Sequence, residues 1–222
     1  SAAIMTYFTN NLLFENNLIY DSFAGFFSKG GSNTNHTMRL NVIRNSAKAF
    51  RVSFTSNVRF YQNIIENCDL AFQPAEGISD IGFFNNTIIG GTSGVDNWFP
   101  SNDFSVYNNI FVNSQKPYFF EGGLGTNMLS DRNLFFGYTR FEIGAFRDNL
   151  LGWRSTYAFD QNSLEADPMF VDILSGDYHL QNPSPARGLG RAVYGVGGAN
   201  NSITPAGAYI SGTEVIGLLS TP

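Results

Sequence analysis

The chain has 222 residues, of which only 14% are charged, against about 25% in an average domain, while 25 are asparagine and 15% are aromatic. The aromatic content excludes a disordered chain, the net charge of −5 argues against a nucleic-acid partner, and no apolar run reaches the ~20 residues of a membrane span. The single cysteine, Cys68, excludes a disulfide framework, so cysteine usage does not reveal the compartment.

An internal repeat organises residues 1–140. In each unit an asparagine is followed two residues later by Ile or Phe, and these asparagines are spaced by 24, 22, 23, 23 and 24 residues. They are Asn17, Asn41, Asn63, Asn86, Asn109 and Asn133. In all six units the residue four positions after this anchor is a turn former; in the first five units the residue three positions earlier is apolar, the one five later is small, and the one nine later is mostly aromatic. The pattern is typical of short strands separated by bends.

The repeat predicts an all-β fold, a right-handed parallel β-helix of about six coils. Coils stacked ~4.8 Å apart would bury the apolar columns and align the asparagines in a ladder. A leucine-rich repeat has an overlapping period but needs several leucines per unit, and a propeller blade needs ~40 residues. The inward columns here are Ile and Phe, and no helical period separates the strands.

Three polar stretches are expected to be loops that leave the coils, namely residues 28–37, 90–103 and 122–127. The first contains His36, which is expected at the surface, and the second carries Trp98. Cys68 shares its column with Ser and Gly, which predicts a small inward corner residue and not a nucleophile.

The repeat degrades after Asn133, and residues 141–222 are predicted to form irregular last coils and a cap, with a short helix around Trp153 as one possibility. The ending contains Asp167-Pro168-Met169-Phe170-Val171-Asp172, Gly176-Asp177-Tyr178-His179-Leu180, Ser184-Pro185-Ala186 and Gly207-Ala208-Tyr209. It resembles the closing segment of secreted, pectate-lyase-like β-helix proteins, including alginate and chondroitin lyases, although Arg187-Gly188-Leu189-Gly190 replaces the family's usual sequence after Ser-Pro-Ala. The resemblance implies a secreted or cell-surface protein whose partner is an acidic polysaccharide.

The open apolar end of a β-helix needs a cover. We expect Phe170, Val171, Tyr178 and Leu180 to cover the carboxyl-terminal end, with His179 as a structural part of this cap. The amino-terminal coils show no comparable segment, so a preceding segment or a second chain is expected to cover them.

A lyase needs a cation that neutralises a uronate carboxylate, and a base. Stacking places Arg39 near Tyr61, with Lys48 and Arg51 further along the same coil, so these four are the candidate catalytic residues. The alternative is a set of ordinary solvent-facing cross-strand pairs.

Substrate binding is predicted for an outward aromatic stripe and its neighbours. These residues are Tyr61, Phe84, Tyr107, Trp98, Arg44 and Glu66. Aromatic side chains on three successive coils would form an exposed face for sugar rings. Packing under loops or against a partner explains the same stripe equally well.

No metal site is predicted with certainty. Asp172 with Asp177 suggests a possible Ca²⁺ site, although aspartate turns without metal are commoner, and Asp96 with Asp103 forms a conceivable carboxylate pair beside the Trp98 loop. Two functions stay open: a polysaccharide-lyase-like protein that binds or cleaves an acidic polysaccharide, or a non-catalytic structural, adhesive or glycan-binding segment of a larger surface or fibre protein.

Overall fold

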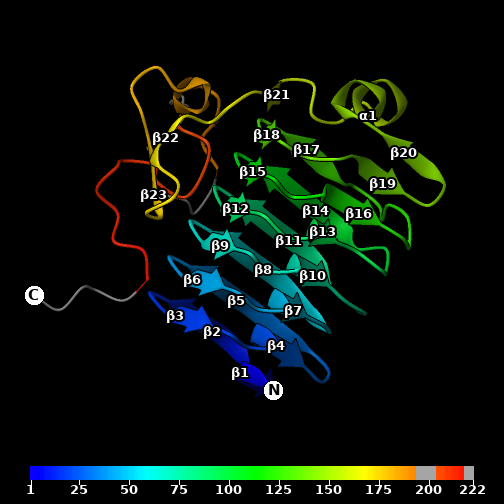
Figure 1. The fold of residues 1–222 in the computed structure, drawn as a ribbon. Coiled ribbons are helices and arrows are strands. Elements are labelled where there is room, and N and C mark those ends of the chain that lie inside the picture. Colours follow the sequence, from blue (N-terminus) through cyan, green and yellow to red (C-terminus); the bar gives the residue numbers. More distant parts are fainter. Residues whose placement is uncertain (194–203, 218–222) are drawn as a thin grey trace, which may run out of the picture.

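A computed structural model describes residues 1–193 and 204–217 of the chain. They form a parallel β-solenoid of about six turns with one short α-helix (Figure 1). The predicted fold class is confirmed, while its right-handed sense stays a prediction. Within the described part of the chain, no helix is both long and apolar enough to cross a membrane.

Three sheets run along the stack, and each of the first six coils contributes one strand to each. Sheet A contains, in spatial order, β1 (Ala2–Tyr7), β4 (Ala24–Lys29), β7 (Lys48–Val52), β10 (Leu70–Pro74), β13 (Ser93–Asp96), β16 (Lys116–Phe120), β19 (Phe141–Ile143) and β20 (Phe146–Asp148). Sheet B contains β2 (Asn10–Glu15), β5 (Asn33–Arg39), β8 (Thr55–Tyr61), β11 (Ser79–Phe84), β14 (Asn102–Tyr107) and β17 (Leu129–Asp131). Sheet C contains β3 (Leu18–Tyr20), β6 (Val42–Arg44), β9 (Ile64–Glu66), β12 (Thr87–Ile89), β15 (Ile110–Val112), β18 (Leu134–Phe136) and β21 (Leu164–Glu165). Within these three sheets all pairs are parallel except β19 with β20.

The bends between strands explain the turn column of the repeat. Asn45, Asn67 and Asn113, each four residues after a ladder asparagine, have φ of 51°, 50° and 53°, and Gly90 has 74°. Glycine, asparagine and aspartate, which the first coil has at Asp21 with φ of 52°, tolerate this left-handed region better than other residues. The chain therefore turns from sheet C toward sheet A at a residue type that the sequence supplies in every coil.

The asparagine ladder is confirmed. The Nδ2 of Asn41 donates to the Oδ1 of Asn63 at 2.9 Å, and Asn63 donates to Asn86 at 2.9 Å. The ladder starts at Asn17 and ends at Asn133, whose amide donates to the buried carboxylate of Asp160 at 3.0 Å. Every coil is thus tied to the next by buried amides as well as by backbone pairing.

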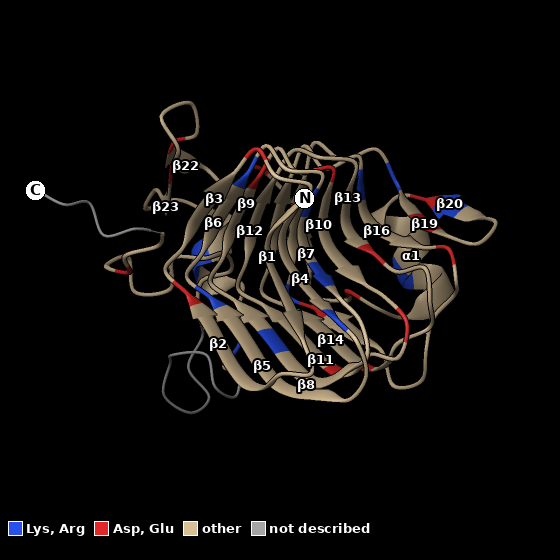
Figure 2. Ribbon diagram, turned by 90° about the horizontal axis from the view of Figure 1, so that it is seen from below, with Lys and Arg blue, Asp and Glu red and all other residues tan. Residues whose placement is uncertain are grey.

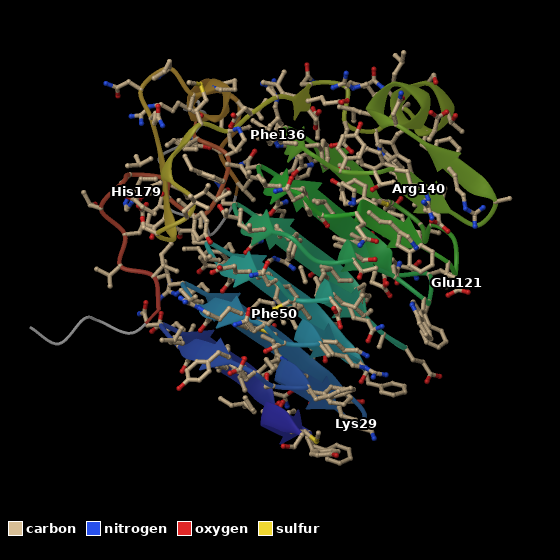
Figure 3. All side chains as sticks on the ribbon, viewed as in Figure 1. Lys29, Phe50, Glu121, Phe136, Arg140 and His179 are labelled. Atoms are coloured by element: carbon tan, nitrogen blue, oxygen red, sulfur yellow. The ribbon has the colours of Figure 1, made fainter. Side chains whose placement is uncertain are left out.

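Aromatic side chains fill the interior as the columns predict. Phe50 and Phe72 from sheet A meet Phe60 and Phe83 from sheet B, and the rings of Phe72 and Phe83 stack at 5.4 Å. Figure 3 shows Phe50 within the stack. Cys68 is a buried inward corner residue, as predicted.

The carboxyl-terminal end is closed by α1 (Leu150–Tyr157) and the β19–β20 hairpin. Asn149 caps the helix by accepting a hydrogen bond from the Gly152 amide, and the fully buried Trp153 packs on Phe141 at 5.4 Å. The expectation of a helix around Trp153 is therefore confirmed.

The residues expected to cover this end lie elsewhere. The hairpin of β22 (Phe170–Asp172) and β23 (Asp177–Leu180), the short 3₁₀ helix Pro185–Gly188 and the segment that follows form a C-terminal arm, residues 166–193 and 204–217. Phe170 and Tyr178 pack on the outer face of sheet C with Val112 and Ile64, and Val171 is exposed. The capping prediction for Phe170, Val171, Tyr178 and Leu180 is wrong, because the arm folds back along the side of the stack (Figures 1 and 2).

The first expected loop is also wrong. Residues 28–37 contain only a tight turn at Gly30–Ser32, and His36 lies in β5 with its ring fully buried beside Phe26. The Nε2 of His36 contacts the Thr9 carbonyl at 3.0 Å. Burial lowers the pKa of His36, so the ring is a neutral core residue.

At the amino-terminal end the strands β1, β2 and β3 are sheet edges, and Met5, Tyr7 and Phe8 are exposed there. A cover from a preceding segment or a second chain stays a prediction.

Candidate functional site

The structure distributes the predicted site residues over three faces. Arg39 and Tyr61 lie on sheet B, Arg44 and Glu66 on sheet C, and Lys48 and Arg51 on sheet A. The four candidate catalytic residues are therefore brought together as two separate pairs and not as one constellation.

Arg39 and Tyr61 are neighbours in register, as expected. The Nη1 of Arg39 donates to the Tyr61 hydroxyl at 3.2 Å, and its Nη2 forms an ion pair with Glu15 at 2.7 Å. Both groups are thus already engaged within the protein.

The aromatic stripe is not exposed, which corrects the expectation for Tyr61, Phe84 and Tyr107. These side chains are 7%, 7% and 6% exposed, because Val193 and Ile210 of the arm pack on them. Of the two readings of the stripe, packing under another segment is the one observed.

A file of outward side chains on sheet A, here called the sheet A file, is the face that combines cations, aromatic rings and buried polar groups. Its members are Phe27, Arg51, Gln73, Asp96 and Phe119, which are aligned in the register of β4, β7, β10, β13 and β16. Each follows a core residue by one position and so points away from the core.

The centre of the sheet A file is polar and buried. Gln73 and Asp96 are only 5% and 3% exposed, and the Nε2 of Gln73 donates to Asp96 at 3.4 Å. The Oε1 of Gln73 and the Nε of Arg51 are buried without a hydrogen-bond partner among the described residues. Unsatisfied buried groups of this kind are costly, which makes this position a candidate for binding.

Two neighbouring cations border this centre. Arg51 lies over the Phe27 ring at 4.9 Å, and Lys48 lies over the Phe23 ring at 5.2 Å. In the described part of the chain neither has a carboxylate within ion-pair distance. Burial, followed by the charge of Arg51, lowers the pKa of Lys48.

The other end of the sheet A file carries its own charges. Burial raises the pKa of Asp96, although the hydrogen bond from Gln73 and the charge of Lys116 each act to lower it. Lys116 lies 4.0 Å over the Phe119 ring and pairs with Glu142 at 3.3 Å.

Trp98 stands at the edge of this face. Trp98 is 54% exposed on the loop after β13, and it lies close enough to Asp96 to work against the raised pKa of that carboxyl. Asp103, which was considered as a partner of Asp96, lies exposed on β14 of sheet B. The conceivable carboxylate pair is therefore not formed.

Gln73 and the two rings of the sheet A file were not among the predicted site residues. A signal was present, because Phe27, Arg51, Gln73, Asp96 and Phe119 all stand ten residues after a ladder asparagine. That column is the first outward position beyond the aromatic core column.

Arg44 and Glu66 are neighbours in register and line a pocket of about 270 Å³ between sheet C and the arm. Tyr178, Tyr209 and residues 174–176 close it from the arm side. These two predicted substrate-binding residues are thus placed together, away from the sheet A file.

Potential metal ligands do not gather in the described residues, where no group of three or more His, Cys, Asp or Glu side chains is found. Asp172 and Asp177 are hairpin partners, and each accepts hydrogen bonds from the local backbone. Burial raises the pKa of Cys68 to about 12, so its thiol is protonated at neutral pH. His179 is paired with Asp177 and stacked on Tyr209.

Comparison with known proteins gives one match. No curated protein and no solved structure matches the chain. The family described as "Periplasmic copper-binding protein (NosD)" matches residues 1–133, more than half of the 222 residues. Among the residues that the structure describes, the dispersed His, Cys and Asp side chains do not fit a copper centre. The family is periplasmic and thus lies outside the cytoplasm. On the length of this match, the chain belongs to the NosD family.

Proposed function

We propose that this chain binds an acidic polysaccharide along the sheet A file and does not cleave it. The observation that carries the proposal is the pair Lys48 and Arg51, two adjacent cations without carboxylate partners among the described residues, beside the buried amide of Gln73. Guanidinium and ammonium groups are the natural partners of uronate carboxylates. Phe27, Phe119 and Trp98 add ring faces on which sugars pack.

The file suits a polymer because its groups repeat along the stack. Its half-buried members are Phe27 and Arg51, one coil (~4.8 Å) apart, and Phe119, three coils beyond Arg51, so a chain running along the solenoid axis can contact them in turn. Binding without cleavage is favoured because Arg39 and Tyr61, the other two candidate catalytic residues, are engaged with each other on sheet B. We also propose secretion or surface display, which agrees with the periplasmic family.

Binding is tested by affinity electrophoresis and calorimetry with alginate and polygalacturonate, with dextran as the neutral polymer. The wild type is expected to bind the acidic polymers, with affinity that falls as salt rises. The double variant Lys48→Gln, Arg51→Gln is expected to lose at least about tenfold in affinity. The matched control is Arg59→Gln, which removes a cation paired with Asp80 on sheet B. Equal binding of dextran, or loss of binding in the control alone, would refute the proposal.

Eliminative cleavage is the second candidate function, and one observation favours it. The lowered pKa of Lys48 beside Arg51 is the arrangement in which a lysine acts as base while an arginine neutralises the carboxylate. It is tested by following the ultraviolet absorbance of unsaturated product with the same polymers, with and without Ca²⁺. Product formation that disappears in Lys48→Gln would replace the non-catalytic proposal.

A further inference from the structure

We infer that the pocket between sheet C and the arm binds a small hydroxylated monocarboxylate, of about the size of one sugar acid. The pocket is formed by two segments that are far apart in sequence. Arg44 and Glu66 come from β6 and β9, whereas Tyr178 and Tyr209 come from the arm. The inference does not depend on the sheet A file, which lies on another sheet.

The size of the pocket limits its ligand. A volume of about 270 Å³ lies just below the ~300 Å³ at which pockets for drug-sized ligands begin. A single ring with its substituents fits this space, whereas a polymer would have to leave through the open side.

The charges indicate an anionic group on the ligand. Arg44 is exposed, and among the described residues its guanidinium has no hydrogen-bond or ion-pair partner. Glu66, its register neighbour, interacts instead with the Tyr178 hydroxyl, and burial together with the Glu66 charge raises the pKa of Tyr178. Arg44 therefore presents donors in a fork that matches a carboxylate.

Glu66 sets the rest of the selectivity. A dianion such as phosphate would be repelled by this carboxylate, whereas hydroxyl groups can donate to it. The hydroxyls of Tyr178 and Tyr209 supply further donors and acceptors. One carboxylate with several hydroxyls on the same small ligand satisfies both sides of the pocket.

The experiment is calorimetry of the full chain with glucuronate, with glucose and acetate as probes that each lack one half of the recognition. Glucuronate is expected to bind at least about tenfold tighter than either, because glucose lacks the charged hydrogen bonds to Arg44 and acetate lacks the hydroxyl hydrogen bonds to Glu66. Arg44→Gln is expected to abolish this preference, and Tyr178→Phe to weaken glucuronate binding. Arg59→Gln is the matched control and is expected to bind as the wild type does.

Ligand binding in the pocket and polymer binding on the sheet A file can be tested independently of each other. The double variant Lys48→Gln, Arg51→Gln is expected to retain glucuronate binding while it loses alginate. No heat with glucuronate in the wild type, or an undiminished affinity in a folded Arg44→Gln, would overturn the inference whatever the polymer result. Thermal unfolding of each variant confirms that it is folded, since Arg44 lies at the surface and its replacement leaves the core intact.

Discussion

Replacement of Asn63 in the middle of the ladder tests how much the buried amides contribute to stability. The Oδ1 of Asn63 accepts from the backbone and side-chain amides of Asn41 at 3.1 and 2.9 Å, and its Nδ2 donates to the Met38 carbonyl and to Asn86. All these groups are fully buried. Asn63→Ala leaves two donors of Asn41 without a partner, since water does not reach them.

Each buried donor left unpaired costs about 1–3 kcal/mol, so Asn63→Ala is expected to lower the free energy of unfolding by about 3–5 kcal/mol. The matched control is Asn17→Ala, in the same column of the first coil. Asn17 is half-buried, and along the ladder its side chain only donates, to Asn41. In Asn17→Ala the backbone amide of residue 17 still donates to the Oδ1 of Asn41, so the loss in free energy of unfolding is expected to stay below about 1 kcal/mol.

The assay is urea unfolding followed by far-ultraviolet circular dichroism, with amide hydrogen exchange in the coils around residue 63 as a local readout. Solenoids unfold in part as well as globally, so the exchange data show whether the loss is confined to neighbouring coils. Equal losses for Asn63→Ala and Asn17→Ala, within about 0.5 kcal/mol, would refute the reasoning.

Three further predictions concern single residues. Gly91 has φ of 84°, and a Cβ there would clash with the Cys68 carbonyl oxygen, so Gly91→Ala is expected to lower the free energy of unfolding in urea by more than about 2 kcal/mol. The control is Gly31→Ala, where a Cβ meets nothing within 4 Å and the expected loss is less than about 0.5 kcal/mol. Burial alone would raise the pKa of Glu142, but hydrogen bonds from Arg140 and Lys116 lower it on balance, so its stabilisation is present above the unfolded pKa of ~4.3 and is lost as pH falls through the folded pKa. Glu142→Gln is expected to flatten this acid-side loss in unfolding measured from about pH 6 to pH 3, and an unchanged slope would contradict it. Cys68 is expected to resist thiol reagents at neutral pH until the protein unfolds, because it is buried with a pKa of about 12; rapid labelling of the folded protein would show otherwise.

The stack was predictable from the sequence because a solenoid converts sequence spacing directly into contact. Residues 22 to 24 positions apart touch, so the column of Asn41 and Asn63 had to form a ladder and that of Phe50 and Phe72 a core. The same register placed Arg39 beside Tyr61 and Arg44 beside Glu66.

The path of the arm was not predictable in this way, because the arm has no repeat. Its apolar residues Phe170 and Tyr178 indicate that it covers something, but the end of the stack and the side of sheet C offer similar apolar surfaces. The choice depends on contacts such as the Gly207 amide with the Asn108 carbonyl at 2.8 Å, which no local pattern encodes. For this reason the sequence predicted an exposed stripe at Tyr61 and Phe84, which the arm in fact covers.

The position of the arm also bears on where the proposed polymer would bind. The arm runs back as far as the amide of Gly217, which donates to the Leu40 carbonyl at 2.8 Å, and it covers the outer side of sheet C and the adjoining edge of sheet B. Sheet A lies on the opposite side of the stack, where Figure 3 shows Arg140 far from His179 of the arm.

A ligand extended over several coils therefore meets the columns of sheet A without displacing any part of the arm, whereas on sheet C it would have to remove the packing of Phe170 and Tyr178. Burial of such side chains stabilises by about 1.5–3 kcal/mol each, which a weakly bound sugar residue does not replace. On sheet A the proposed polymer would contact Lys48, Arg51 and the Trp98 loop, so the proposed binding face is one that the arm leaves uncovered.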